Sequence, residues 1–196
     1  MSRPLPPIVL GSSSRYRREL MSRLRLDFIC DAPDIDEQAL AGESPRAQAI
    51  RLARTKAAAV AARHAGACVI GSDQVAWSGG DRYGKPGTRE AAIAQLTALS
   101  GRVIVFDTAL CVIDGRDGSL HEALVPTEVA FRRLQAQEIE RYIDLDTPLD
   151  CAGAAKSESL GISLLERMSG DDPTALVGLP LIRLAAILRD LGFSLP

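Results

Sequence analysis

The sequence predicts an α/β protein built on a mixed β-sheet. Apolar runs with strand character alternate with helical patterns over the first hundred or so residues, and longer strand-like runs joined by turns follow. Alternating strands and helices are typical of parallel pairing, whereas strands joined by tight turns pair antiparallel, so we expect both orientations in one sheet. A length of 196 residues suits one domain, or two small lobes that share a core.

The individual elements follow from hydrophobic periodicity and from helix start and stop signals. Ser13 or Ser14 is placed to cap the first helix, Ser44 caps the second before Pro45, and Gly192 closes the last. The expected strands cover 7–11, 67–77, 102–115, 121–131 and 163–170, and the expected helices cover 15–25, 45–64, 88–99, 134–144 and 181–191.

Composition argues against several classes of protein. The net charge of −2 leaves no global basic surface for nucleic acid, and the apolar runs are much shorter than the roughly 20 residues that span a bilayer. The N-terminal apolar run is also too short for a secretion signal, so we expect a cytoplasmic protein without a membrane partner. The cysteines (Cys30, Cys68, Cys111 and Cys151) form no CxxC pair and suit buried free thiols in a reducing compartment, and the two histidines are spaced too widely for a zinc cluster.

The first chemical signal is a run of serines and arginines between the first strand and the first helix. After Gly11 come three serines (Ser12, Ser13 and Ser14), and then Arg15, Tyr16, Arg17 and Arg18. A helix start favours an anion, and arginine offers paired donors that fit phosphate oxygens. The spacing is not that of a Walker loop. Two interpretations remain, a phosphate cradle or a serine-capped helix with a solvated basic face.

Three further charged residues stand in unusual places. Lys56 falls inside the apolar arc of the helix over 45–64, so its ammonium either extends to water along the surface or points into a cleft. Asp73 ends an apolar strand, where a carboxylate is costly unless it is paired, hydrogen-bonded or bound to metal; it either begins a turn or faces a cleft. Lys85 lies in a glycine-rich hairpin and is either solvated or part of the site.

Two late stretches extend this set. "CAGAAKSESLG" carries Lys156 and Glu158 among small residues, which allow a backbone to approach a ligand closely. Asp171 and Asp172 either bind a metal or cap a turn. Together with Glu37, the chain offers both the cations that neutralise a polyphosphate and the carboxylates that hold metal or water, as phosphate-bond cleavage requires.

The order and spacing of the motifs resemble those of the Maf-like nucleotide pyrophosphatases. The stretches that carry the resemblance, over about 7–192, are "LGSSSRYRREL", "DIDE", "RLARTKA", "GSDQV", "GKPGTREAAIAQLTALSGR", "CAGAAKSESLG" and "DPTALVGLPL". The resemblance implies a single domain over 1–196 with a fold like that of inosine-triphosphate pyrophosphatases, in which an elongated mixed sheet flanked by helices forms two lobes with a central cleft. It also implies a cytoplasmic enzyme that uses a divalent cation, Mg²⁺ or Mn²⁺, and forms a homodimer.

The same resemblance implies roles for individual residues. Asp73 is the proton acceptor that activates water, and it holds the metal together with Glu37. The expected substrate-binding residues are Ser12, Ser14, Arg17, Arg18, Lys56, Lys85 and Lys156. The sequence departs from the family pattern at Arg15, where proline is common, and at Tyr16, which precedes the arginine pair.

Three positions are expected to set substrate preference, namely Tyr16, Gln74 and Glu158. The pair Asp73-Gln74 and the late glutamate resemble the 7-methyl-GTP branch of the family rather than the branch that prefers dTTP and UTP. Methylation at N7 makes guanine cationic, so Tyr16 offers an aromatic face and Glu158 an acceptor for the N1–H and amine donors. We therefore expect hydrolysis of 7-methyl-GTP to 7-methyl-GMP and pyrophosphate, which clears modified nucleotides. The alternatives are a dTTP/UTP pyrophosphatase and a non-catalytic nucleotide-sensing regulator of cell division.

Overall fold

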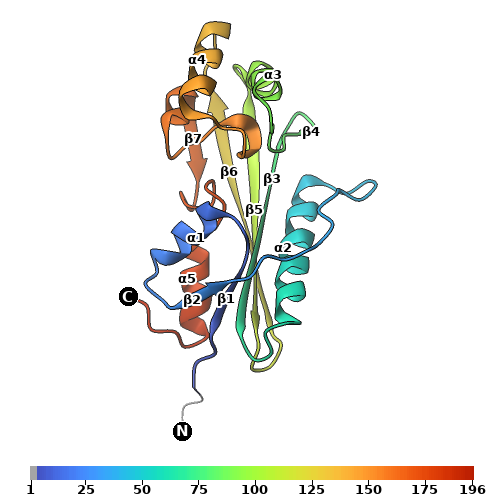
Figure 1. Ribbon diagram of the computed structural model, residues 1–196, viewed down its shortest axis with the longest axis vertical. Helices are drawn as coiled ribbons and strands as arrows, with labels where there is room; N and C mark the ends of the chain where they lie inside the picture. Colours follow the sequence, from blue (N-terminus) through green and yellow to red (C-terminus); the bar gives the residue numbers. More distant parts are fainter. Residues whose placement is uncertain (1–3) are drawn as a thin grey trace. The chain divides into compact units, whose positions relative to one another are not determined.

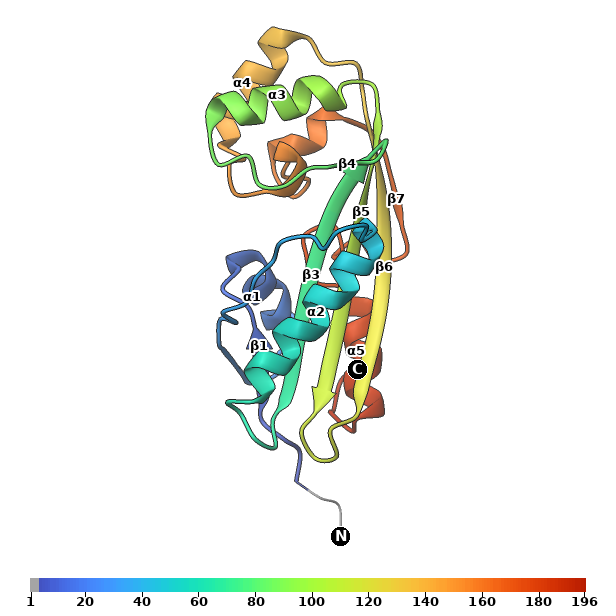
Figure 2. The same cartoon turned by 90° about the vertical axis from the view of Figure 1, so that its right-hand side faces the viewer.

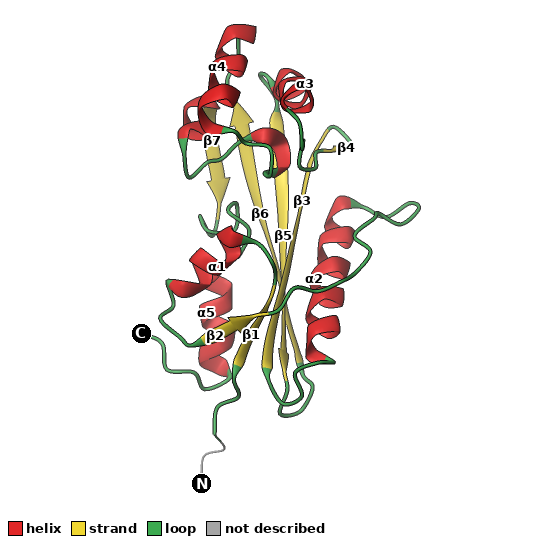
Figure 3. Ribbon diagram, in the orientation of Figure 1, coloured by secondary structure: helices red, strands yellow, loops and turns green. Residues whose placement is uncertain are grey.

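The computed structural model describes residues 4–196 and contains a seven-stranded sheet flanked by helices (Figure 3). The strands are β1 (Ile8–Gly11), β2 (Phe28–Cys30), β3 (Cys68–Ser78), β4 (Asp81–Arg82), β5 (Val103–Asp114), β6 (Leu120–Phe131) and β7 (Leu165–Gly170). The α-helices are α1 (Arg15–Ser22), α2 (Pro45–Ala61), α3 (Arg89–Leu99), α4 (Ala136–Asp146) and α5 (Leu181–Asp190), and the 3₁₀ helices are η1 (Ala152–Ala154) and η2 (Leu160–Leu164).

The sheet is mixed, which confirms the predicted fold class. Its strand order is β2-β1-β3-β5-β6-β7, and β4 pairs with β3. β1 runs parallel to both β2 and β3, whereas β4 is antiparallel to β3 and β7 is antiparallel to β6. No helix within residues 4–196 is long and apolar enough to cross a lipid bilayer.

The chain forms two compact units. Unit 1 comprises residues 1–74, 108–125 and 172–196, and unit 2 comprises residues 75–107 and 126–171. The long strands β3, β5 and β6 contribute residues to both units.

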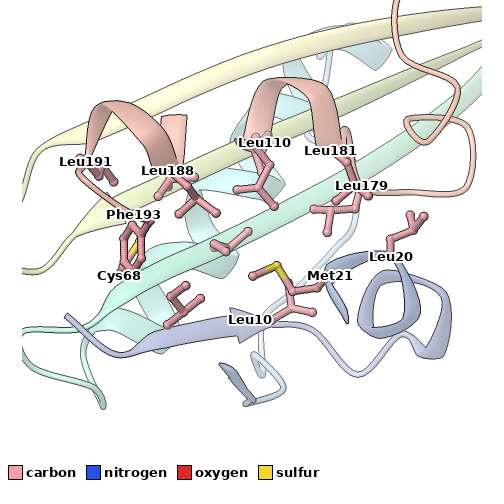
Figure 4. Packing of buried hydrophobic residues seen from close by; sticks show 14 residues of the cluster. Leu10, Leu20, Met21, Cys68, Leu110, Leu179, Leu181, Leu188, Leu191 and Phe193 are labelled. Carbon is pink, nitrogen blue, oxygen red and sulfur yellow. The ribbon is translucent and has the colours of Figure 1, made fainter. Parts of the chain in front are cut away.

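In unit 1, helices cover both faces of the sheet: α1 and α5 lie on one face and α2 on the other (Figure 1). Leu10 and Ile70 are partners in the parallel ladder, so their side chains point to the same face of the sheet, and both belong to one buried core with residues of α5. Figure 4 shows Leu10 in this core. That core also takes Leu184 and Leu188 from α5 and Met21 from α1. Burying these side chains favours the folded state by about 1.5–3 kcal/mol each.

The opposite face of unit 1 brings α2 unusually close to the sheet at two glycines. Gly11 of β1 and Gly71 of β3 are partners in the parallel ladder. A Cβ at Gly71 would lie 2.4 Å from the carbonyl oxygen of Ala53 and 2.8 Å from the Cβ of Ala57, so only glycine allows this approach. The short distance between α2 and β3 determines which side chains meet beyond Gly71.

In unit 2, α3 packs against α4 (Figure 2). Leu96 and Leu99 of α3 and Ile139 of α4 are fully buried. Gly153 of η1 has φ +71°, and a Cβ there would lie 3.3 Å from Ile104, so glycine fits both the turn and the packing.

The long elements match their predicted positions, and the differences lie at their ends and in the short pieces. The first helix ends at Ser22 rather than 25, because the chain turns away through Arg25 with a left-handed φ of 57°. The second helix ends at Ala61 rather than 64. Strand β2 and the two 3₁₀ helices were not predicted, since such short segments show no hydrophobic period. The two-residue β4 pairs antiparallel with the end of β3, as expected of the predicted hairpin.

Candidate functional site

The centre of the candidate site is a buried ion pair in unit 1. The Nζ of Lys56 lies 2.6 Å from Oδ1 of Asp73, and both side chains are less than a tenth exposed. A buried charge is costly unless it is paired, so this contact explains how an ammonium and a carboxylate can both lie inside apolar elements. Lys56 does not extend to water, and Asp73 does not begin a turn but lies inside β3, which continues to Ser78.

The pair forms because of the packing of α2 on β3. Asp73 lies two residues beyond Gly71 and therefore points to the same face of the sheet, toward α2. Lys56 follows Ala53 by three residues and therefore lies on the same face of α2. The close approach at Gly71 thus brings the ammonium to the carboxylate.

A second carboxylate shares the same ammonium. Oε1 of Glu37 lies 2.8 Å from Nζ of Lys56, although the Glu37 side chain is 59% exposed. Glu37 comes from an irregular segment before α2, and Gln48 of α2 donates to its backbone oxygen at 3.3 Å. The structure therefore brings together three predicted site residues from three separate stretches of the chain.

The environment of Asp73 raises the pKa of its carboxyl above the ordinary value of 3.8. Burial is the largest cause, and it outweighs the opposing effects of Lys56 and Arg17. Glu37 also raises this pKa through like-charge repulsion. A carboxyl with a raised pKa is a stronger base, as a group that accepts a proton from water must be.

The serine–arginine turn adopts the predicted helix start. Ser14 caps α1, and its Oγ accepts from the backbone N–H of Arg17 at 3.4 Å. Ser12 is buried, and its Oγ accepts from the N–H of Ser14 at 3.1 Å. Arg18 is exposed. The cap is thus present, and it does not exclude the phosphate interpretation, because both serine hydroxyls keep a proton to donate.

Arg17 and Tyr16 have clear local partners. Nε of Arg17 donates to the carbonyl oxygen of Gly178 at 2.8 Å. Burial lowers the pKa of Arg17, while the nearby carboxylates of Asp73 and Glu37 oppose that shift. The guanidinium of Arg15 lies over the ring of Tyr16, 4.7 Å from its centroid, so one aromatic face already carries a cation.

Gln74 points away from Asp73, to the opposite face of β3. Its Nε2 donates to Oγ1 of Thr108 at 2.9 Å and to the carbonyl oxygens of Ala175 and Leu176, both at 3.0 Å. The backbone segment that it binds was not predicted to take part in the site. The signal available in the sequence was strand alternation, which places neighbours on opposite faces.

Three predicted site residues belong to unit 2, and their local contacts differ. Lys85 and Glu158 are exposed. Nζ of Lys156 donates to the carbonyl oxygens of Asp146 and Thr147 at 2.7 and 3.0 Å, where it satisfies the C-terminal end of α4. The proposed contacts of these three side chains with a substrate stay predictions.

Asp172 and two of the four cysteines are buried. Asp172 is buried and accepts from the N–H and Oγ1 of Thr174 and from the N–H of Ile182. Of the two interpretations, a metal ligand or a residue that caps a turn, these contacts match the second. The four cysteines form no disulfide within the described residues. Cys68 and Cys111 are buried, and burial raises the pKa of each thiol to about 12, whereas Cys30 and Cys151 are only half-buried.

Glu37 and Asp73 suit a divalent cation that also binds substrate. Within the described part of the chain, no cluster of three or more His, Cys, Asp or Glu side chains could hold a metal ion. Mg²⁺ is commonly bound through one or two carboxylates, with the other positions filled by water and substrate phosphates. Glu37 and Asp73 both contact the ammonium of Lys56, at 2.8 and 2.6 Å, so the two carboxylates lie close enough together to fit that pattern.

Comparisons with known proteins agree on one family and on one name among its members. The sequence model of the family described as "Maf-like protein" matches residues 7–191. A protein of Cupriavidus metallidurans named 7-methyl-GTP pyrophosphatase is 56% identical, over 96% of this chain and 94% of its own length. Proteins with the same name from Xanthomonas oryzae pv. oryzae and Ralstonia nicotianae are 57% and 54% identical, over 98% and 97% of this chain and 100% and 98% of their own lengths.

Proposed function

This chain belongs to the Maf-like protein family, and we propose that it hydrolyses 7-methyl-GTP to 7-methyl-GMP and pyrophosphate. The observation that carries the proposal is the buried pair of Lys56 and Asp73 with Glu37 beside it. Relatives that share more than half of their residues with this chain over nearly its full length carry the name of that activity. The reaction cleaves the bond between the α and β phosphates.

In the proposed mechanism, Asp73 accepts a proton from the attacking water. The raised pKa of its carboxyl makes the proton transfer easier, and its burial keeps the carboxylate from being hydrated by bulk water. Lys56, already 2.6 Å from the carboxylate, holds a phosphate oxygen next to this base. The ammonium therefore aligns the phosphorus atom with the water that Asp73 orients.

The serine–arginine turn provides the rest of the phosphate site. The hydroxyls of Ser12 and Ser14 and the guanidinium of Arg17 donate to the phosphate oxygens, and the start of α1 adds its partial positive charge. Arg18, Lys85 and Lys156 supply further positive charge in this proposal. Glu37 and Asp73 would hold the metal. When bound, Mg²⁺ or Mn²⁺ neutralises the charge that develops on the phosphates.

Base selectivity is assigned to Tyr16 and Glu158. In this proposal the aromatic ring of Tyr16 stacks on the cationic 7-methylguanine, and Glu158 accepts from its N1–H and amino group. Glu158 is exposed, and its Oε2 accepts from Oγ of Ser157 at 3.4 Å. We also propose that the enzyme acts in the cytoplasm as a homodimer.

A pyrophosphate-release screen tests the proposed function. Wild-type protein is assayed on 7-methyl-GTP, GTP, UTP and dTTP, with Mg²⁺ and with Mn²⁺. We expect the highest kcat/KM on 7-methyl-GTP, and a higher value on UTP or dTTP would favour the other branch. Tight nucleotide binding with no pyrophosphate release would instead support a non-catalytic nucleotide sensor.

Two variants test the roles of individual carboxylates. Asp73→Asn should abolish turnover while the circular dichroism spectrum stays that of the folded protein, and Asp144→Asn, an exposed aspartate on α4, serves as the matched control. Glu158→Gln should reduce kcat/KM on 7-methyl-GTP more than on UTP. Retained pyrophosphate release by Asp73→Asn would rule out the proposed base, and an equal loss on both nucleotides would make Glu158 a general binding residue.

A further inference from the structure

Gln74 follows the proposed base directly but cannot share its surroundings. In β3, Gly71 and Asp73 face α2, whereas Ser72 and Gln74 face the other side of the sheet. On that side lies the backbone segment over 172–179, which we call the 172–179 loop. The contacts of Gln74 therefore have to be understood from this loop.

The 172–179 loop is braced by its own side chains. Asp172 accepts from Oγ1 of Thr174 at 2.6 Å and from the backbone N–H of Ile182 at 2.7 Å. The same Thr174 hydroxyl contacts the carbonyl oxygen of Leu179 at 2.9 Å and the N–H of Leu181 at 2.8 Å. These contacts fix the loop to the start of α5, so its remaining carbonyl oxygens point in fixed directions.

Two polar side chains of the sheet bind those carbonyl oxygens. Gln74 donates to Ala175 and Leu176, and Thr108 of β5 donates to Ala175 at 2.9 Å. Gln74 also donates to Thr108 at 2.9 Å, so the two side chains form one hydrogen-bonded group. The amide N–H donors of Gln74 are thus used by protein acceptors, which leaves this group none to offer a nucleotide base.

The far end of the loop holds Arg17. The carbonyl oxygen of Gly178 accepts from Nε of Arg17 at 2.8 Å and from Oγ of Ser72 at 3.0 Å. Gly178 has φ +120°, which favours glycine, and a Cβ there would approach Nε of Arg17 to 3.5 Å. Because the guanidinium is planar, fixing its Nε–H also fixes the directions of its terminal N–H donors.

We propose that Gln74 is a positioning residue that acts through the 172–179 loop on Arg17. Gln74 and Thr108 hold one end of the loop, Gly178 at the other end orients the guanidinium, and Arg17 in turn meets the phosphate chain of the substrate. The inference rests on the proposed function for the identity of that anion. It assigns Gln74 an effect on every nucleotide triphosphate, not a contact with the base.

A double-mutant cycle tests the coupling between Gln74 and Arg17. Gln74→Leu, Arg17→Ala and the double variant are assayed for pyrophosphate release from 7-methyl-GTP and UTP. Misplacing a binding group by about 1 Å costs up to about 100-fold, so we expect Gln74→Leu to lower kcat/KM by about 10- to 100-fold. The loss should be equal on both nucleotides. In the Arg17→Ala background the same change should cost less than about threefold, because no guanidinium remains to be misplaced.

The matched control is Ser78→Ala, which removes a side-chain hydrogen bond to a backbone oxygen from the same strand but has no contact with the loop. It should leave kcat/KM within about twofold of the wild type. Thr108→Val perturbs the loop from β5 with little change of shape, and it replaces Gln74→Leu in the cycle if the latter does not fold. A merely structural effect would lower the melting temperature and leave the losses of Gln74→Leu and Arg17→Ala additive.

Additive losses, or a loss confined to 7-methyl-GTP, would overturn the positioning role. A wild-type protein that releases pyrophosphate from no nucleotide would instead contradict the proposed function. In that case, the same cycle is measured by calorimetric binding of inorganic tripolyphosphate. Coupled losses of affinity would still support the positioning of Arg17, and wild-type protein that does not bind tripolyphosphate would overturn it.

Discussion

Replacing Lys56 with methionine should destabilise the protein strongly, and in a manner that depends on pH. Lys56→Met keeps an unbranched side chain of similar length but removes the charge that lies 2.6 Å from Asp73. Breaking a buried ion pair by removing one partner typically costs about 3–5 kcal/mol, because the other charge stays buried. Both side chains are less than a tenth exposed, so solvent does little to reduce this cost.

Protonation of Asp73 sets an upper limit on the loss. A carboxyl with the ordinary pKa of 3.8 can escape the penalty by taking up a proton, which costs about 1.4 kcal/mol for each pH unit above that value. The limit is therefore about 4 kcal/mol at pH 7 and about 2 kcal/mol at pH 5. In the variant, the folded protein holds this proton more tightly than the unfolded chain, so the stability of Lys56→Met should fall as the pH rises from 3.8.

Urea unfolding followed by circular dichroism at pH 7 and pH 5 measures this effect. Glu37→Gln is the control, because its partner is the same ammonium but its side chain is 59% exposed, and exposed pairs contribute at most about 1 kcal/mol. The double variant Lys56→Met/Asp73→Asn should recover most of the lost stability, since neither of the two positions then carries a buried charge. A loss for Lys56→Met no larger than that for Glu37→Gln, or one that does not change with pH, would refute the reasoning.

Three further changes test other parts of the fold. Lys156→Met removes the ammonium that binds the last carbonyl oxygens of α4 and should cost about 1 kcal/mol in thermal unfolding, whereas Lys85→Met, at an exposed position, should cost almost nothing. Hydrogen bonds from Arg116 lower the pKa of Asp114, so the stability that Asp114 contributes is present above pH 3.8 and is lost at lower pH. The melting temperature of Asp114→Asn should therefore lie below that of the wild type at neutral pH, and the difference should disappear as the pH falls. Gly71→Ala should destabilise by about 3 kcal/mol, since its Cβ would lie 2.4 Å from a backbone oxygen of α2, and an unchanged urea midpoint would contradict that packing.

The longer elements were predictable because each shows several repeats of its hydrophobic period. β2 was not, because its three residues show no period and it becomes a strand only by pairing with β1. The mixed nature of the sheet followed from the connections, whereas the order of the strands depends on packing between distant segments. The close approach of α2 at Gly71 had no local signal, since glycine within a strand suits several arrangements.

Part of the candidate site was visible in the sequence as charges inside apolar patterns. Lys56 and Asp73 both break such a pattern, and a buried charge requires a partner, so their pairing follows from the cost of burial. The sequence did not indicate that Gln74 and Lys156 would bind backbone carbonyl oxygens. Such contacts depend on where a loop or a helix end lies, and no residue type in the partner marks the position of a carbonyl oxygen.

Unit 1 is built from three separate segments of the chain, and this affects how it can fold during translation. Its core draws Leu10 from the first strand and Leu184, Leu188 and Phe193 from the last helix and the segment after it. A ribosome delivers α5 and the segment after it later than the rest of this core, so the apolar face of β1 and β3 is covered only in part, by α1, until residues 179–193 have been synthesised. Nascent chains of this protein should therefore depend on chaperones until α5 emerges and covers that face.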